Sequence, residues 1–408
     1  MSGWKEYSFG DLVDFPPKIQ LKKGEEYPFI DMDIVKPENR YVTNLQSKKY
    51  DSSGSAKFAD KDVLLARITP CLENGKISQV KISEGTKGFG STEFFVFRAK
   101  VKLLDQNFLF YLSKSDLIWK NAVNSMVGAS GRQRADASFL KRVTLIIPEL
   151  DEQRKIAAIV TSYDDLIENN QRRIALLEKM AEELYREWFV RLRFPGHEKV
   201  KVVKGMPEGW ESKPLTLLAD ITYGYAFDGA RFNAQGNGKP IIRIRNIINS
   251  NITEFTDEIP NDKYIVKCGD LLVGMDGEFH VNHWINDEGY LVQRVCRINA
   301  KSERIRGYLA QAIKAPIKHF ESILQGATVG HLGAAHLKTI NLLNPPESMN
   351  KHLEILNSLL DQKITISRMN LDLSKTRDLL LPRLISGRLP VEHLDIKFPP
   401  SMLAEMQD

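Results

Sequence analysis

The residues most suggestive of catalysis in this chain follow Pro148. Glu149, Asp151, Glu152 and Lys155 combine carboxylates with a lysine, a set of groups that nucleases use. The stretch also looks like the start of a helix, where the helix dipole favours acidic residues. The helix start explains these residues without any catalytic role.

A second cluster, Glu278, His280 and His283 in the run EFHVNH, contains residue types that bind zinc. The run is predicted to be a loop, so surface or ligand-facing polar chemistry explains it better than a metal site. The chain has three cysteines and none forms a CxxC pair. This usage indicates a reducing cytoplasm and argues against both a disulfide framework and a thiolate zinc site.

Asn344-Pro345-Pro346-Glu347 is similar to the Asn-Pro-Pro-aromatic motif with which amino-methyltransferases hold a flipped base. Its fourth residue is glutamate, which cannot stack on a base, and no glycine-rich S-adenosylmethionine motif accompanies it. The chain also lacks a P-loop lysine motif, GxSxG, and GxGxxG between a strand and a helix. These observations favour a protein without catalytic activity.

Two loops carry side chains suited to reading DNA bases, since Arg pairs with guanine and Asn or Gln with adenine. The first loop, GASGRQRADAS, and the second, GATVGHLGAAH, each set polar residues on a small-residue backbone. A third group lies in IIRIRNI. The candidate DNA-binding residues are Ser130, Arg132, Gln133, Arg134, Thr328, His331, Arg243, Arg245 and Asn246.

Composition places limits on these hypotheses. The chain has 408 residues, 42% of them hydrophobic and 27% charged, with a net charge of +5. It is too long for one compact core, so at least two domains are expected. Neither a signal peptide nor a membrane span is recognisable, which predicts a cytoplasmic protein without membrane contact. The modest positive charge is compatible with a polyanionic partner but is not specific for one.

The sequence repeats itself with offsets of 197 to 212 residues. WKEYSFGDL at Trp4 is echoed by WESKPLTLL at Trp210, and DVLLARI at Asp62 by DLLVGMDG at Asp270. FLKRVTLIIPE at Phe139 is echoed by HLKTINLLNPPE at His336. The matches keep their order, so the chain is predicted to contain two equivalent halves.

Each half ends in a stretch with the apolar spacing of a coiled coil. The first stretch carries one inward-facing stripe, Ile156, Val160, Tyr163, Ile167, Asn170, Ile174, Leu177 and Leu184. The second carries Leu359, Ile366, Leu373 and Leu380, with Ile355, Gln362, Met369 and Thr376 as its other row. The two patterns superimpose at an offset of 199. At about 40 residues, or roughly 60 Å, each helix exceeds the usual globular length, so the two are expected to pair, with Asn170 opposite Gln362.

These patterns predict an α+β chain of six segments. Two mixed α/β domains cover residues 1–150 and 210–346, and long helices cover 151–193 and 347–390. A linker at 194–209 and a tail at 391–408 complete the chain.

The helical stretches carry a family resemblance. The run from Asp151 to Gly196, DEQRKIAAIV…REWFVRLRFPG, resembles the central conserved helix of type I restriction–modification specificity subunits. RDLLLPRLISGRL, from Arg377 to Leu389, is similar to the C-terminal signature of that family. The resemblance spans about residues 1–390 and is looser in the globular parts.

The resemblance implies two target-recognition domains held apart by two antiparallel conserved helices. Each domain would read one half of an asymmetric, bipartite site in double-stranded DNA. Two methyltransferase subunits and the restriction subunits would be the protein partners, and S-adenosylmethionine, ATP and magnesium would bind to those partners rather than to this chain. The alternatives are a self-sufficient DNA methyltransferase or nuclease, and a coiled-coil adaptor that does not bind DNA.

Overall fold

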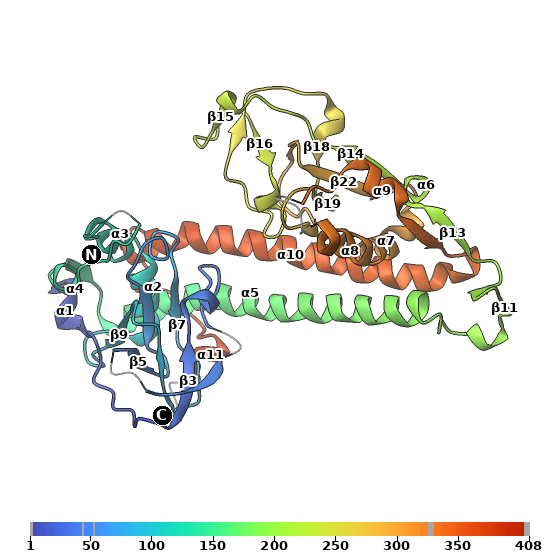
Figure 1. Ribbon diagram of the computed structural model, residues 1–408. Coiled ribbons are helices and arrows are strands. Elements are labelled where there is room, and N and C mark those ends of the chain that lie inside the picture. The colour runs from blue at the N-terminus through green and yellow to red at the C-terminus, as the bar shows by residue number, and fades with distance from the viewer. Residues whose placement is uncertain (1–2, 43–44, 52–53, 130, 325–329, 404–408) are drawn as a thin grey trace. The chain divides into compact units, whose positions relative to one another are not determined.

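The computed structural model describes residues 3–42, 45–51, 54–129, 131–324 and 330–403. The chain divides into two compact units. The first unit contains residues 1–169 and 372–408, and the second contains residues 170–371. Figure 1 labels many of the elements of both units.

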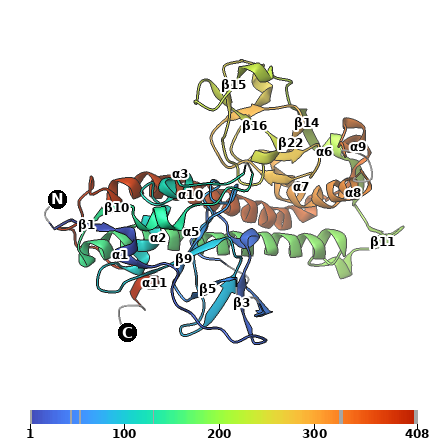
Figure 2. The same cartoon turned by 60° about the vertical axis from the view of Figure 1, so that its left-hand side comes forward.

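Within its described residues, the first unit contains two four-stranded sheets and one two-stranded sheet. The first sheet has the order β2-β9-β6-β7, with β2 Val13–Asp14, β9 Phe94–Ala99, β6 Val63–Ala66 and β7 Ile77–Gln79. The second has the order β4-β3-β8-β5, with β4 Gln46–Lys49, β3 Glu26–Ile30, β8 Lys87–Gly90 and β5 Ala56–Ala59. The third pairs β1 Lys5–Ser8 with β10 Thr144–Ile147, adjacent strands in Figure 2. The helices are α1 Phe9–Leu12, α2 Gln106–Lys114, α3 Trp119–Asn124, α4 Ala137–Lys141 and the short α11 Pro400–Leu403.

The second unit repeats this topology. Its sheet β14-β22-β19-β20 corresponds to β2-β9-β6-β7, with β14 Ala219–Tyr223, β22 Val295–Ala300, β19 Leu271–Gly274 and β20 Val281–His283. The five-stranded sheet β15-β17-β16-β21-β18 contains β15 Phe232–Asn233, β17 Phe255–Thr256, β16 Lys239–Ile242, β21 Gly289–Leu291 and β18 Ile265–Val266. β13 Glu211–Pro214 pairs with β23 Asn341–Asn344, and β11 Val202–Val203 with β12 Met206–Pro207. The helices are α6 Leu215–Leu218, α7 Arg306–Ala312, α8 Lys314–Leu324 and α9 Ala334–Thr339.

One unusual pairing occurs in both units. β3 pairs with β8 in parallel, and β16 pairs with β21 in parallel, whereas the other strand pairs within these sheets are antiparallel. Parallel pairing requires a long crossover connection. The same crossover in both units means that the internal repeat of the sequence is a repeat of fold.

Two long helices complete the architecture. α5 spans Leu150–Tyr185 and continues as one π-helical turn, Arg186–Val190, while α10 spans Asn350–Ile385. The boundaries between the two units fall inside these helices. In the second unit, contacts join Asn170 to Asn370, Glu178 to Lys363, and Trp188 to His352. Residue numbers increase along α5 as those of the contacting residues on α10 decrease, so the two helices run antiparallel.

The residues assigned to the inward stripe of α5 are buried or partly buried, as are Leu359, Ile366, Leu373 and Leu380 on α10. The other row expected on α10 is displaced by one residue. Ile355 and Met369 are 45% and 50% exposed, and Gln362 and Thr376 are exposed as well. The row that faces inward is instead Leu356, Lys363, Asn370, Arg377 and Leu384.

The expected register was therefore wrong. Asn170 Nδ2 donates to Asn370 Oδ1 at 2.9 Å rather than meeting Gln362, whose side chain bonds to Ser358 one turn earlier. A cross-helix amide pair satisfies hydrogen-bonding groups that would otherwise be buried unpaired. It also disfavours a slipped register, because slipping would separate the two amides.

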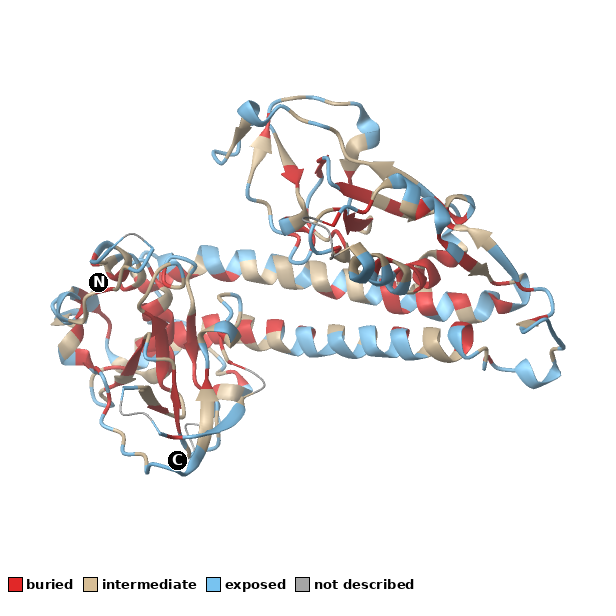
Figure 3. Cartoon of the chain, viewed as in Figure 1, coloured by how far each residue is buried: buried red, intermediate tan, exposed pale blue. Residues whose placement is uncertain are grey.

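Apolar cores hold each β-rich part on its helices. In the first unit Phe9, Phe97, Phe108 and the α5 residues Ile156 and Val160 belong to one buried cluster. In the second, Phe189 of the π-helical turn packs against Trp210 and Tyr308, with ring centroids 5.6 and 4.8 Å apart. Figure 3 shows burial concentrated in the sheets and on one side of each long helix.

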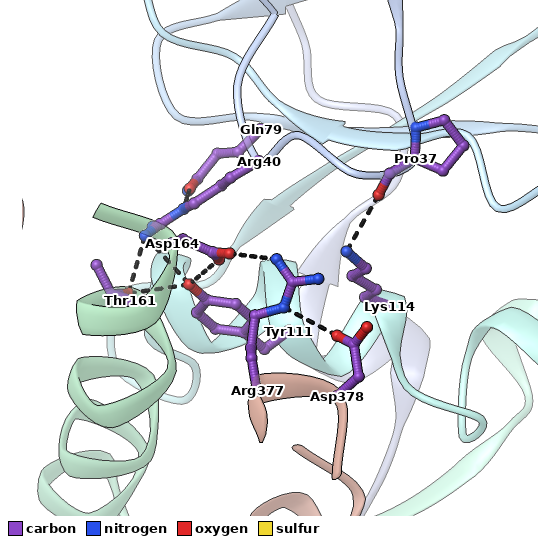
Figure 4. Close-up of polar contacts among 9 residues, drawn as sticks. All are labelled: Pro37, Arg40, Gln79, Tyr111, Lys114, Thr161, Asp164, Arg377 and Asp378. Carbon is purple, nitrogen blue, oxygen red and sulfur yellow. Dashed lines mark hydrogen bonds and ion pairs between the residues drawn. The ribbon is translucent and has the colours of Figure 1, made fainter. Parts of the chain in front are cut away.

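A buried polar network connects the first unit's β-rich part to both long helices (Figure 4). Arg40 donates to Gln79 Oε1 at 2.9 Å and to Thr161 Oγ1 of α5 at 2.8 Å. Tyr111 Oη donates to Asp164 Oδ2 at 2.6 Å, and Arg377 Nη1 of α10 donates to Asp164 Oδ1 at 2.6 Å. Every one of these side chains is at most 7% exposed.

The protonation of this network follows from its burial. Burial raises the pKa of Tyr111 well above its ordinary value, and the nearby Asp164 carboxylate adds to that effect. The phenol therefore stays protonated and donates its hydrogen bond. Asp164 in turn accepts from one neutral and one charged donor, so its charge is matched by Arg377.

Removing the carboxylate at position 164 should be strongly destabilising. Asp164→Asn leaves the buried Arg377 guanidinium with only the exposed Asp378 carboxylate as a counter-ion, and breaking a buried ion pair typically costs about 3–5 kcal/mol. Chemical denaturation of the full chain measures this loss. The control is Asp378→Asn, because Asp378 also pairs with Arg377 but is 57% exposed, so its loss should stay within about 1 kcal/mol. Equal losses in the two variants would contradict the assigned importance of burial.

In the second unit, His283 at the end of β20 is 5% exposed. Burial, followed by the nearby Lys363, Lys314 and Arg306 charges, lowers its pKa to about 3. Below pH 6.5 the unfolded chain therefore binds a proton at this imidazole that the folded chain does not bind. Stability is lost as the pH falls, because the state that binds more protons is favoured by acid.

Replacing His283 should flatten the acid side of the stability profile. Between pH 6.5 and pH 5 the wild-type chain should lose roughly 1.6 kcal/mol more than His283→Gln, because the slope increases from half of 1.36 kcal/mol per pH unit at pH 6.5 to nearly its full value at pH 5. Denaturation midpoints at both pH values test this. Parallel pH profiles would show that His283 is protonated normally in the fold.

Candidate nucleic-acid interface

The first candidate loop is fastened to the end of strand β6. Val127 and Arg134 exchange backbone hydrogen bonds of 3.0 and 2.9 Å that close the loop. Ala135 N donates to Arg67 O at 2.8 Å, and Thr69 N donates to Gln133 O at 3.0 Å. Gly128, at φ 126°, has the Arg132 carbonyl 3.3 Å from where a Cβ would stand. The positive φ strongly favours glycine here, and the close contact adds to that preference.

The side chains of this loop carry more positive than negative charge. Arg134 binds Glu93 in bidentate fashion, with nitrogen–oxygen distances of 2.7 and 3.0 Å. Arg67 lies 3.6 Å from the same carboxylate. The Arg134 hydrogen bond lowers the pKa of Glu93, which therefore stays ionised. Arg132 is exposed and has no ion-pair partner among the described residues.

The second candidate loop occupies the same place in the second unit. Leu332 N donates to Met275 O at 2.7 Å, as Ala135 does to Arg67. Met275 N donates to Arg294 O at 2.8 Å, as Arg67 N does to Glu93 O at 2.9 Å. By these backbone bonds His331 corresponds to Arg134 and Arg294 corresponds to Glu93.

The side chains at these equivalent positions differ. His331 Nδ1 lies 2.6 Å from Asp276 Oδ1, and Arg294 Nε lies 3.2 Å from Asp276 Oδ2. Arg294 has φ 75°, a left-handed conformation that is costly for a residue with a Cβ and that often marks functional loops. One carboxylate thus holds an arginine and a histidine here, where Glu93 holds two arginines in the first unit.

The third candidate group is separate from these loops. Arg243 and Arg245 both bind Glu254, and Arg243 also lies over Phe232 at 5.0 Å. Asn246 is 1% exposed, and its Oδ1 accepts from Arg243 N at 2.8 Å. In this conformation Asn246 stabilises a turn and presents no atom to a ligand. Ser130 and Thr328 lie outside the described residues.

Sequence reasoning did not assign Glu93, Arg67, Asp276 or Arg294 to these sites. Each lies in a strand or connection remote from its loop in the sequence. The available signal was the internal repeat, because it aligns the strand ends that carry them.

The clusters considered for catalysis have structural explanations. Asn344-Pro345-Pro346 ends β23, and the carbonyls of both prolines accept hydrogen bonds from Arg304 at 2.5 and 2.6 Å. Glu278 pairs with His280 at 3.4 Å, while His283 is buried beside cations. In the part of the chain that the structure describes, no group of three or more His, Cys, Asp or Glu residues is placed to hold a metal.

None of the described helices is both long enough and apolar enough to cross a membrane. The fold and the two loops define a class of protein with two equivalent β-rich domains, each presenting a charged loop of its own composition, together with two antiparallel long helices.

The comparisons identify the family. The type I restriction modification DNA specificity domain matches residues 1–179 and 207–372. The chain therefore belongs to the specificity-subunit family of type I restriction–modification systems, a non-catalytic subunit that implies DNA target recognition within a larger complex.

Individual relatives agree. The chain is 25% identical over 418 residues to the type I restriction enzyme MjaVIII specificity subunit of Methanocaldococcus jannaschii, covering 96% of this chain and 94% of that protein. It is also 25% identical over 302 residues to the MjaIX specificity subunit of the same organism, covering 70% of each. The crystal structure of a type I system S subunit from M. genitalium has a TM-score of 0.54 at 16% identity, covering 93% of this chain and 96% of that one. That likeness concerns the fold.

Proposed function

We propose that this chain recognises an asymmetric, bipartite site in double-stranded DNA and directs separate methyltransferase and restriction subunits to it. The observation that carries the proposal is the pair of loops. They are attached to the same strand ends by the same backbone bonds but present different charged groups, Arg134 with Glu93 in one and His331 with Asp276 in the other. Equivalent loops with different side chains suit two different half-sites.

The loop chemistry supports a role in contacting DNA. Arginine reads guanine and binds phosphate, and a carboxylate that holds the guanidinium limits its rotation. Arg132, exposed and without an ion-pair partner among the described residues, is the best candidate in the first unit for direct contact. In the second unit the candidates are His331, Arg243 and Arg245.

The family supports the proposed division of labour. Two methyltransferase subunits would bring S-adenosylmethionine, and restriction subunits would bring ATP and magnesium. This chain would determine which DNA sequence the complex binds, and it would bind none of these cofactors itself. The two long helices are the proposed spacer between the readers, so that the gap between half-sites becomes part of the recognised sequence.

Methylation mapping tests the proposal directly. One set of cells expresses the chain together with the methyltransferase subunit encoded beside it, and a second set lacks the chain. Methylation of genomic DNA is compared between the two sets. A methylated motif of two different parts with a fixed gap, present only with the chain, is the expected result. Methylation that does not change without the chain would contradict the proposal and favour the adaptor alternative. S-adenosylmethionine binding by the isolated chain would instead favour the methyltransferase alternative.

Arg132→Ala should weaken DNA binding at the first half-site. If the guanidinium contacts a base, the loss should be about 1–3 kcal/mol and the motif should degenerate at one position of that half. If it contacts phosphate, binding should weaken for all sequences and the salt slope should fall by about 1. Titration of duplex at several salt concentrations separates the two results. The control is Arg142→Ala, an exposed arginine at the end of α4. An affinity unchanged in Arg132→Ala, or reduced equally in both variants, would exclude this loop from the interface.

Lengthening both long helices should change the gap in the methylated motif. Four residues added after Gln171 and four after Leu371 add about 6 Å, from a rise of about 1.5 Å per residue. At about 3.4 Å per base step, the gap should grow by one or two base pairs. The same methylation mapping measures the gap. A motif with an unchanged gap would contradict the spacer role while leaving DNA recognition intact.

A further inference from the structure

Two ion pairs that join the long helices have the same polarity, with the acid on α5 and the base on α10. In the first unit Arg377 Nη1 of α10 donates to Asp164 Oδ1 of α5 at 2.6 Å. In the second unit Lys363 Nζ of α10 lies 2.6 Å from Glu178 Oε1 of α5. Both acids belong to α5 and both bases belong to α10.

These four residues occupy only two positions of the internal repeat. Lys363 lies 199 residues after Asp164, and Arg377 lies 199 residues after Glu178. This is the offset at which one apolar row of α5, Val160, Ile167 and Ile174, coincides with the row Leu359, Ile366 and Leu373 of α10. Each repeat position therefore carries an acid in the first copy and a base in the second.

Burial makes the signs important. Asp164 and Arg377 are 7% and 6% exposed at their side chains, and Lys363 is 19% exposed. Glu178 is more open, at 46%. Charges that are withdrawn from water must be matched by an opposite charge, and like charges opposite each other are strongly unfavourable.

The repeat raises a specific alternative pairing. Because α5 and α10 share this apolar row, α5 has the shape to pair with α5 of a second copy in the same antiparallel register. Asp164 of each copy would then face Glu178 of the other. A pairing of α10 with α10 would place Lys363 against Arg377. Both pairings bring like charges together.

We infer that this sorting of charge restricts α5 to pairing with α10 and excludes self-pairing between two copies of the chain. Charges flanking a coiled-coil stripe select partners in this way, by penalising the wrong pair as well as stabilising the right one. Resting on the proposed function, the inference has a consequence for the target. A helix pair that accepts only one α5 and one α10 carries two different recognition domains, so the two halves of the DNA site are read by different side chains.

The test uses the full chain and the more exposed ion pair, which lies outside the Asp164–Tyr111 network. The double variant Glu178→Lys/Lys363→Glu keeps an opposite-charge pair within the chain. It also gives each long helix one acid and one base, so self-pairing would now bring opposite charges together. The matched control, Glu178→Gln/Lys363→Gln, removes the attraction without making self-pairing favourable.

Each protein is unfolded and then refolded without DNA at several protein concentrations. Its molar mass is measured by light scattering after gel filtration. The wild-type chain and the neutral control should refold as monomers. The exchanged variant should contain at least about tenfold more dimer at the same concentration, corresponding to a modest change in pairing preference. Refolding two differently tagged copies together, followed by capture through one tag, confirms the dimer.

Three results would overturn the inference. One is an exchanged variant that stays as monomeric as the wild type, and another is a neutral control that dimerises equally, since dimers would then follow from instability alone. The third is a wild-type chain that self-associates as much as the exchanged variant. Because no DNA is present, these results are independent of the methylation mapping, and either inference can fail without the other.

Discussion

The ion pair between Asp164 and Arg377 is the interaction on which the first unit depends most. It joins α5 to α10 and, through the Tyr111 hydroxyl, joins both to the β-rich part. An apolar contact at the same place would tolerate sliding, because hydrophobic attraction has little direction. A buried carboxylate with two specific donors does not tolerate it. The network thus determines how the recognition domain sits on its own part of the helices.

In the second unit, different side chains attach the β-rich part to the long helices. Its ion pair, Glu178 with Lys363, is less buried, and aromatic packing of Phe189 against Trp210 and Tyr308 provides much of the attachment. The backbone topology is conserved between the units while the side chains that fasten it are not. The same holds for the candidate loops, where equivalent backbone bonds support different charged groups. A duplicated scaffold with different side chains in its two copies suits the proposed recognition of two different half-sites.

The sequence was informative where a pattern extends over many residues. The order of repeated motifs predicted two equivalent halves, and heptad spacing predicted two long helices. It failed on the second row of α10, where Ile355 and Leu356 are adjacent and either fits an apolar stripe. The row that is buried continues through Lys363, Asn370 and Arg377, and a search for apolar residues rejects charged ones, since these are rarely buried unless paired. Their partners lie on a helix 185 to 213 residues earlier in the chain, so a search of the local sequence does not find them.

The candidate sites show the same limit. Asn246 is a residue type suited to reading adenine, yet its amide is consumed by a turn. Arg134 was recognisable from its loop, but Glu93, which orients it, comes from a distant strand end. Residue type indicates what a side chain can do, and only the fold determines whether its hydrogen-bonding groups are already occupied.

The charged residues buried between the long helices, such as Asp164 and Arg377, need an explanation beyond stability. Replacing a buried ion pair with well-packed apolar residues is often neutral or stabilising, so stability alone does not explain Asp164 and Arg377. In a chain with an internal repeat, the two long helices have similar sequences and similar shapes, so each helix resembles its own partner. Apolar packing would then distinguish poorly between partner and self. Opposite charges at equivalent repeat positions distinguish the correct partner helix from a second copy of the same helix. The ion pairs contribute less stability than apolar packing would, but they permit a single pairing.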